Sequence, residues 1–156
     1  MNNPLAPLMA LLAQTERERD DALAQHQRLE AALQAAQAQA DQLLTYRRDY
    51  EQRWTTQFSK EGSMPLFNCY QNFNERLTQA VDFQRNAVQQ AQYQADRGRA
   101  LWMEQEIRVA SVRKLIERRV HELQLSAERR EQKTSDEFAS RLSWSNTRGP
   151  GAAATS

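Results

Sequence analysis

The chain is poor in the residues that break helices and in those that build catalytic or metal sites. Among 156 residues it has four glycines, four prolines, one cysteine and two histidines. The single cysteine, Cys69, excludes an internal disulfide, and a metal site at its thiol would need other ligands. His26 and His121 are far apart in the sequence, and no glycine-rich phosphate-binding loop is present. We therefore expect no enzyme activity, no cofactor and no metal site.

An excess of charge of one sign and a long hydrophobic run are also missing. The net charge is +1, from 21 basic and 20 acidic residues, so the chain has no general attraction for nucleic acid or for an anionic membrane. The uncharged run from Met1 to Thr15 is too short to cross a bilayer, contains Pro4 and Pro7, and lacks the basic start of a signal peptide. We expect a soluble cytoplasmic protein with no nucleic-acid partner and no direct membrane insertion.

The residues that are abundant favour long helices. Alanine, glutamine, arginine, glutamate and leucine dominate, which is typical of a coiled coil. The apolar fraction of 40% includes many alanines, which bury little area, so a two-helix ribbon suits it better than a globular core. Steps of three and four residues mark a seam in the first half, at Ala22, His26, Leu29, Leu33, Ala36, Ala40 and Leu43. The pattern predicts a helix over residues 5–58, with a weak, charged stretch at residues 15–21.

A turn is expected at residues 59–65, where Gly62 suits a helix C-cap and Pro65 suits the first turn of the next helix. A second helix is predicted over residues 66–142. Its expected seam is Tyr70, Phe73, Leu77, Ala80, Gln84, Ala87 and Ala91, and, after a slip of phase, Trp102, Val109, Val112, Ile116 and Leu123. The slip falls near Gly98, which costs roughly 1 kcal/mol against alanine inside a helix. A bend or a closely packed neighbour is expected there.

The predicted fold is all-α: a long antiparallel two-helix coiled-coil hairpin over residues 1–142, with the second helix longer and a disordered tail at residues 143–156. Folding back about the turn makes a map that can be checked. It places Trp54 opposite Tyr70, Tyr50 opposite Phe73, Leu43 opposite Ala80 and Ala36 opposite Ala87. The second helix then overhangs the first at about residues 122–141, a charged stretch that suits a solvated single helix.

The first candidate functional feature is a basic run in the second helix. From Arg108 to Arg119 there are five basic residues and one acid, Glu117. The run is either a solubilising helix face or a docking surface for an acidic partner. A DNA-binding basic region is disfavoured, because such a region leads into a leucine zipper, and here the zipper-like spacing overlaps the charges.

The second candidate feature is the aromatic end of the hairpin. Its members are Tyr46, Tyr50, Trp54, Tyr70 and Phe73. They are either the core of the hairpin end or a partly exposed patch, because Tyr and Trp often dominate binding interfaces. Arg47, Arg48 and Arg53 border them and suit a polar rim. Elsewhere, His26 is expected to be a core residue and Cys69 a half-buried small hydrophobe rather than ligands or nucleophiles.

The motifs also resemble a known family. LLTYRRDYEQRW is followed by a short loop, CYQNFNERLTQAV, a tryptophan at Trp102, the run KLIERR and the ending EQKTSDEFASR. In this order and spacing, residues 8 to 142 resemble the flagellar export protein FliJ family of the bacterial type III export apparatus.

The resemblance implies a non-enzymatic adaptor and chaperone of export, similar to the central stalk of rotary ATPases. It implies three partners: the hexameric ring of the export ATPase FliI, the cytoplasmic domain of the export gate protein FlhA, and free export chaperones. It also implies a cytoplasmic location, peripheral to the inner membrane at the flagellar base. The implied gate-binding patch is Gln39, Leu43, Tyr46, Tyr50, Phe73, Leu77, Ala80 and Gln84. Gln84 departs from the family, in which a histidine can stand there.

The end of the hairpin that holds the two termini is implied to enter the ATPase ring. The residues that we expect to contact the ring are Leu8, Leu12, Arg108, Arg113, Arg118 and Arg119. Two other functions remain open from the sequence: the stalk protein of a virulence type III secretion system, and a plain structural coiled coil that self-associates through its seams.

Overall fold

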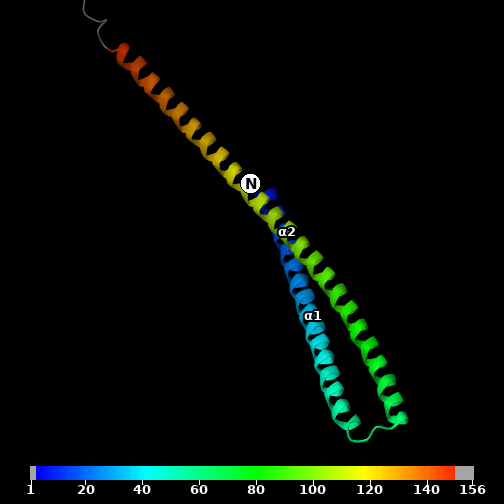
Figure 1. The fold of residues 1–156 in the computed structure, drawn as a ribbon. Helices are drawn as coiled ribbons and strands as arrows, with labels where there is room; N and C mark the ends of the chain where they lie inside the picture. Colours follow the sequence, from blue (N-terminus) through cyan, green and yellow to red (C-terminus); the bar gives the residue numbers. More distant parts are fainter. Residues whose placement is uncertain (1–2, 150–156) are drawn as a thin grey trace, which may run out of the picture. The chain divides into compact units, whose positions relative to one another are not determined.

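Two long helices and a short loop make up the fold, as predicted (Figure 1). The computed structural model describes residues 3–149. Helix α1 spans Ala6–Phe58 and helix α2 spans Met64–Thr147, with 53 and 84 residues, and no strand occurs in residues 3–149. Neither helix is long and apolar enough to cross a membrane, as far as the structure describes the chain.

The loop between the helices is shorter than the predicted turn. Helix α1 closes with the N–H groups of Lys60 and Glu61 donating to the carbonyl of Gln57, each at 3.0 Å. Gly62 does not adopt the positive φ of a left-handed cap, so the predicted capping role is wrong. Helix α2 begins at Met64, and Pro65 lies in its first turn, where the N–H that proline lacks would have no partner inside the helix.

The chain divides into two compact units, each with one segment from each helix. The first holds residues 3–13 and 110–149 of the described chain, and the second holds residues Gln14–Val109. The second unit contains the loop and most of the hairpin. Each unit is described by itself below.

In the second unit, the seam of α2 is unbroken, so the predicted slip of phase at Gly98 is wrong. Buried and half-buried residues alternate in steps of four and three, at positions 77, 81, 84, 88, 91, 95, 98, 102, 105 and 109. Val81 lies in the seam with 2% of its surface exposed, whereas the predicted Ala80 is exposed. Both residues fit a spacing of three or four from Leu77, and the larger valine gains more by burial. Gly98 itself occupies a seam position.

Helix α1 passes close to Gly98, and any side chain at position 98 would displace the end of Leu29. A Cβ atom placed on Gly98 would lie 2.6 Å from Cδ1 of Leu29 and 3.6 Å from Cα of His26. One turn further along α2, the ring of Trp102 stacks on the imidazole of His26, with centroids 5.4 Å apart and planes 4° from parallel. A packed neighbour at Gly98 was one of the two sequence-based expectations, and it is confirmed.

The charged stretch of α1 at residues 15–21 also follows the seam. Thr15 is buried and Arg19 is half-buried. Nε of Arg19 lies 3.0 Å from Oδ1 of Asp20 and 3.9 Å from Oε1 of Glu106, and Nη1 of Arg108 lies 3.6 Å from Oε2 of Glu18. Ion pairs between the helices therefore accompany the buried Val109 in this part of the seam.

In the first unit, α2 has buried or half-buried residues at Val112, Ile116, Val120 and Leu123, and half-buried leucines lie at Leu8 and Leu12 of α1 and at Leu5 just before it. Residues 124–149 are all exposed. We call residues 124–147 the exposed segment of α2. The helix continues to Thr147, so the prediction that it ends at residue 142 is wrong. In the added turn, Oγ of Ser145 donates to the carbonyl of Leu142 and Oγ1 of Thr147 donates to that of Ser143, so these hydroxyls bond within the helix. The rest of the predicted tail, from residue 150, lies outside the described residues.

Candidate functional site

The aromatic residues at the loop end of the hairpin form a continuous set of ring contacts between the two helices. We call this set the aromatic ladder: Tyr46, Tyr50, Trp54 and Phe58 on α1, and Phe67, Tyr70 and Phe73 on α2. Trp54 stacks on Tyr70 with centroids 4.4 Å apart and planes 6° from parallel. Tyr50 meets Phe73 at 4.4 Å. These two contacts confirm two of the four predicted pairs, Trp54 with Tyr70 and Tyr50 with Phe73.

Further ring contacts extend the ladder at both ends. Tyr46 meets the edge of Phe73 at 6.5 Å, Tyr50 stacks on Tyr70 at 5.7 Å, and Phe58 meets Phe67 at 5.9 Å. Such pairs contribute about 0.5–1.5 kcal/mol each beyond the burial of area. The ladder therefore stabilises the end of the hairpin.

Part of the ladder is open to solvent. Tyr46 is 52% exposed and Phe73 is 36% exposed, while Tyr50, Trp54 and Tyr70 are half-buried. The seam of α1 runs through Leu43, Arg47, Tyr50 and Trp54 in steps of four and three, which leaves Tyr46 beside the seam rather than in it. The two sequence-based interpretations of these aromatics, core and exposed patch, are therefore both true of different residues.

A groove of about 830 Å³ runs along one side of the ladder. We call it the tip groove. Its aromatic lining is Tyr46, Tyr50, Trp54 and Tyr70, and the remaining lining residues are Gln52, Arg53, Thr56, Gln57, Leu66 and Cys69. Arg53 is the only charged residue among them. Cys69 is exposed, so the prediction of a half-buried cysteine is wrong: its neighbour Tyr70, not Cys69, faces the rings of α1.

The phenol of Tyr50 is held in its protonated form. Burial raises the pKa of Tyr50 above its usual value, and the nearby Cys69, Tyr70 and Tyr46 groups raise it further, because a charge on any of them would repel tyrosinate. The hydroxyl of Tyr50 is thus available as a hydrogen-bond donor across the physiological pH range.

The eight residues of the predicted gate-binding patch all lie in the second unit, but only half of them are exposed. Gln39, Tyr46, Phe73 and Ala80 are exposed, and Leu43 and Tyr50 are half-buried. Leu77 and Gln84 are 7% and 9% exposed and lie in the seam. Nε2 of Gln84 donates to the backbone carbonyl of Ala36 at 3.0 Å. The last two residues are therefore placed to hold the helices together.

The structure does not bring the predicted ring-binding residues into one unit. Leu8, Leu12, Arg113, Arg118 and Arg119 lie in the first unit, whereas Arg108 lies in the second and pairs with Glu18. Nη1 of Arg119 lies 3.2 Å from Oε2 of Glu122, and Arg118 is exposed. Arg108 and Arg119 therefore each have an acidic neighbour within their own unit.

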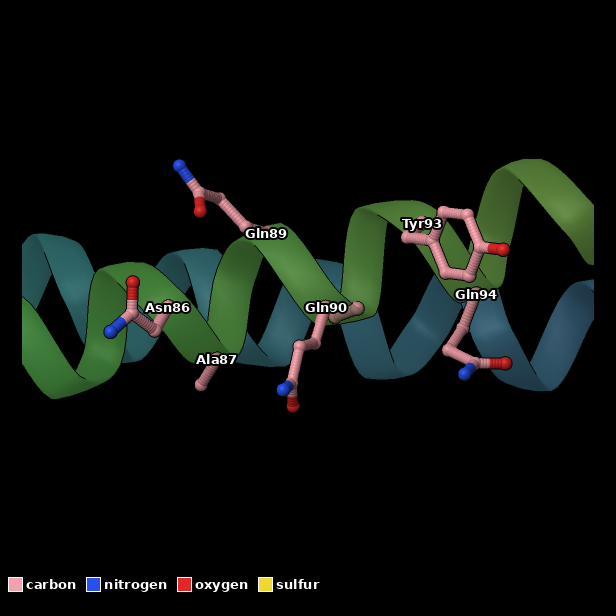
Figure 2. Close-up of a pocket in the computed structure, with 7 residues that line it drawn as sticks. Asn86, Ala87, Gln89, Gln90, Tyr93 and Gln94 are labelled. Carbon is pink, nitrogen blue, oxygen red and sulfur yellow. The ribbon is translucent and has the colours of Figure 1, made fainter.

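Residues 3–149 contain no group of three or more His, Cys, Asp or Glu side chains that could hold a metal ion. His26, one of the two histidines, is stacked between the helices on Trp102. A second hollow lies on the outer face of α2, between Asn86 and Gln94 (Figure 2). Figure 2 shows Gln89 and Gln90 pointing away from each other, so these amides do not converge on a ligand.

A comparison with protein families identifies the family of the chain. The family described as flagellar FliJ protein matches residues 4–148, which is nearly all of the sequence. The chain belongs to the FliJ family. No curated protein matches the chain significantly. The FliJ family is a non-enzymatic component of flagellar protein export, so this chain is a coiled-coil protein of that process.

The family resemblance and the structure emphasise different residues. The patch implied by the resemblance omits Arg53, Trp54 and Cys69, although all three line the tip groove beside Tyr46 and Tyr50. The sequence held a signal for two of them, since Trp54 completes the aromatic stripe and Arg53 borders it. Nothing in the spacing indicated that Cys69 would be exposed.

Proposed function

We propose that this FliJ family member is an adaptor of flagellar export that links the export ATPase to the export gate. In this proposal the ladder end of the hairpin contacts the cytoplasmic domain of FlhA. The other end, with residues 110–147 of α2, acts as a stalk in the hexameric ring of FliI. The protein then works at the inner membrane of the flagellar base as a peripheral component, and it also binds free export chaperones.

The observation that carries the proposal is the partial exposure of the ladder. A hairpin end needs buried rings only, yet Tyr46 and Phe73 present large aromatic surfaces to solvent. Exposed aromatics of this kind, backed by rings that fix their orientation, are typical of the central residues of binding interfaces. They belong to the set that the family resemblance implies for the gate.

Support for the stalk is the form of the exposed segment of α2. Residues 124–147 are helical and exposed on every side, and Phe138 and Leu142 are 65% and 50% exposed. Phe138 and Leu142 are four residues apart, so they lie on one face of the helix. A helix with exposed apolar side chains on one face suits insertion into a surrounding partner surface.

A pull-down with two partners tests the proposal. We expect the double variant Tyr46→Ala, Phe73→Ala to lose most of its binding to the FlhA cytoplasmic domain, because truncating central hot-spot residues costs about 2 kcal/mol or more each. The same variant should still bind FliI, since residues 110–147 are unchanged. Circular dichroism should show helix content close to that of the unaltered protein.

The chain offers a matched control. Phe83 and Tyr93 are also a phenylalanine and a tyrosine on the second unit, they are 76% and 60% exposed, and neither belongs to the ladder. The double variant Phe83→Ala, Tyr93→Ala should bind FlhA normally. Equal loss of binding in the two double variants, or loss of helix content in the ladder variant, would contradict a specific gate contact. A stable dimer or tetramer of the free protein would instead favour a structural coiled coil.

A further inference from the structure

We infer that the tip groove binds an acidic segment of a partner protein that also carries an aromatic or aliphatic side chain. In this arrangement a carboxylate of the partner pairs with the guanidinium of Arg53, and the apolar side chain lies against Trp54 and Tyr70. The inference rests on the proposed contact between the ladder end and the export gate. It adds the partner's chemistry and three residues, Arg53, Trp54 and Cys69, that the predicted patch does not contain.

The wall of the groove provides the apolar half of the site. Trp54 and Tyr70 lie parallel at 4.4 Å, and Tyr50 also stacks on Tyr70 at 5.7 Å. These contacts fix the ring planes before a partner arrives, so binding costs little side-chain entropy. A volume of about 830 Å³ is enough for a few side chains of a peptide segment.

The charge of the groove lining favours a partner segment with acidic rather than basic side chains. Arg53 is the only charged lining residue, so no carboxylate in the groove could pair with a basic segment. Within residues 3–149 no ion pair occupies Arg53. A guanidinium at the edge of an aromatic groove pairs with a carboxylate through two parallel N–H···O bonds, and such charge-assisted bonds are about twice as strong as neutral ones.

The tyrosine hydroxyls near the rings provide hydrogen-bond donors for the bound segment. The phenol of Tyr50 stays protonated and has the phenols of Tyr46 and Tyr70 for neighbours. Phenol O–H groups can donate to the second oxygen of a carboxylate or to a backbone carbonyl of the bound segment. An acidic segment satisfies these donors better than a basic one, which brings donors of its own.

The only cysteine in the chain provides a direct measurement. Cys69 lines the groove and is exposed, so iodoacetamide should alkylate it in the free protein. We expect the FlhA cytoplasmic domain, at saturating concentration, to slow alkylation of Cys69 at least about fivefold, as expected for a thiol covered in a buried interface. A second protein with Cys69→Ser and Gln90→Cys carries its thiol on the outer face of α2 and should show no protection.

A matched pair of arginines tests the charge. Arg53 lines the groove, whereas Arg48 is exposed on α1 outside it. We expect Arg53→Gln to weaken FlhA binding about tenfold, the equivalent of losing one charge-assisted hydrogen bond. Arg48→Gln should bind within about twofold of the unaltered protein, because an exposed charge away from the contact contributes little.

A synthetic peptide tests the groove without the gate. The probe is the blocked peptide Glu-Asp-Phe-Leu-Glu, compared with Gln-Asn-Phe-Leu-Gln, and Cys69 alkylation is again the measurement. The acidic peptide should protect Cys69 at millimolar concentration, and the neutral one should protect it at least about fivefold less well, since only the acidic one pairs with Arg53. Arg53→Gln should remove the difference between the two peptides.

The outcomes separate this inference from the proposed function. If FlhA binds without protecting Cys69 and Arg53→Gln binds normally, the groove is not the contact and the gate function stands. If FlhA does not bind, the gate function fails and the peptide pair alone decides the groove. Equal protection by both peptides overturns the inference. A second copy of the chain could instead fill the groove with its exposed Phe138. In that case protection of Cys69 would increase with protein concentration alone and would disappear in Phe138→Ala, and this result also overturns the inference.

Discussion

The two helices meet in different ways at the aromatic ladder and in the segment around Gly98. In the ladder, large rings from both arms lie against one another, and part of their surface stays exposed. At Ala95 and Gly98 the residues of α2 are small, with Ala95 1% exposed, and Leu29 of α1 fills the space that a side chain at position 98 would need, while Trp102 one turn further on stacks on His26. Large residues pack the helices together and also leave a surface for binding, whereas small residues only let the two helices lie close to each other.

The segment around Gly98 contains three unsatisfied polar atoms, whereas one, Oδ1 of Asn74, follows the ladder residue Phe73 in the sequence. Nδ1 of His26, Nε1 of Trp102 and Oε1 of Gln105 are buried with no hydrogen-bond partner among the described residues. Leaving a buried polar group unpaired costs about 1–3 kcal/mol. We therefore expect the ladder to contribute more stability per residue than the segment around Gly98.

Truncating the central ring of the ladder should have the largest effect. We expect Trp54→Ala to lower the free energy of unfolding by about 2–4 kcal/mol, because it removes the stack on Tyr70 and the contact with Phe58. Urea denaturation measures the change. Trp144→Ala is the control, since Trp144 is 65% exposed on the first unit, and it should change stability by less than about 0.5 kcal/mol. Similar values for both would mean that the ladder is not a stabilising element.

A side chain added at Gly98, where the two helices are close together, should have an intermediate effect on stability. We expect Gly98→Val to destabilise the protein by about 1–3 kcal/mol, because Leu29 must move out of the seam. Ala100→Val on the exposed face of α2 corrects for the helix propensity of valine. Adding Leu29→Ala should recover part of the loss by making room, and a double variant that is less stable than the sum of the single changes would contradict the close approach.

Titration of Tyr50 should have the smallest effect. Its pKa is raised in the folded state, so its contribution to stability is complete below the unfolded pKa of 10.0 and is lost as pH rises through the folded pKa. We expect Tyr50→Phe to have a shallower loss of stability above pH 10.0 than the unaltered protein. Thermal denaturation at several alkaline pH values measures this loss of stability. Tyr93→Phe, which removes an exposed tyrosine outside the ladder, is the control. A steeper alkaline loss in Tyr50→Phe would mean that the sign is wrong.

The fold was predictable because its signals are periodic and local. Steps of three and four residues define both helices, and the aromatic spacing predicted the contacts of Trp54 with Tyr70 and of Tyr50 with Phe73. The errors arose where two residues fit the same spacing. Ala80 and Val81 both follow Leu77 at a suitable distance, and the choice of Ala80 produced a false slip of phase at Gly98.

The candidate site was predictable only in part, because exposure depends on which face of each helix meets the other arm. The aromatic stripe identified Tyr46 and Trp54 together, yet the seam passes through Trp54 and leaves Tyr46 beside it. Leu77 and Gln84 were placed in the seam by their spacing and in the patch by the resemblance, and both are buried, as the spacing predicted. The end of α2 was missed because serine and threonine, which usually favour turns, here donate to helix carbonyls.

Because the exposed segment of α2 is already helical, a partner can bind it without the free-energy cost of forming a helix. The first turn of an isolated helix is costly to form in water. Residues 124–147 continue a helix that begins at Met64, so each residue only extends a helix that already exists. Phe138 and Leu142 are therefore presented on a formed helical surface, and a partner that accepts them need not fold the segment first.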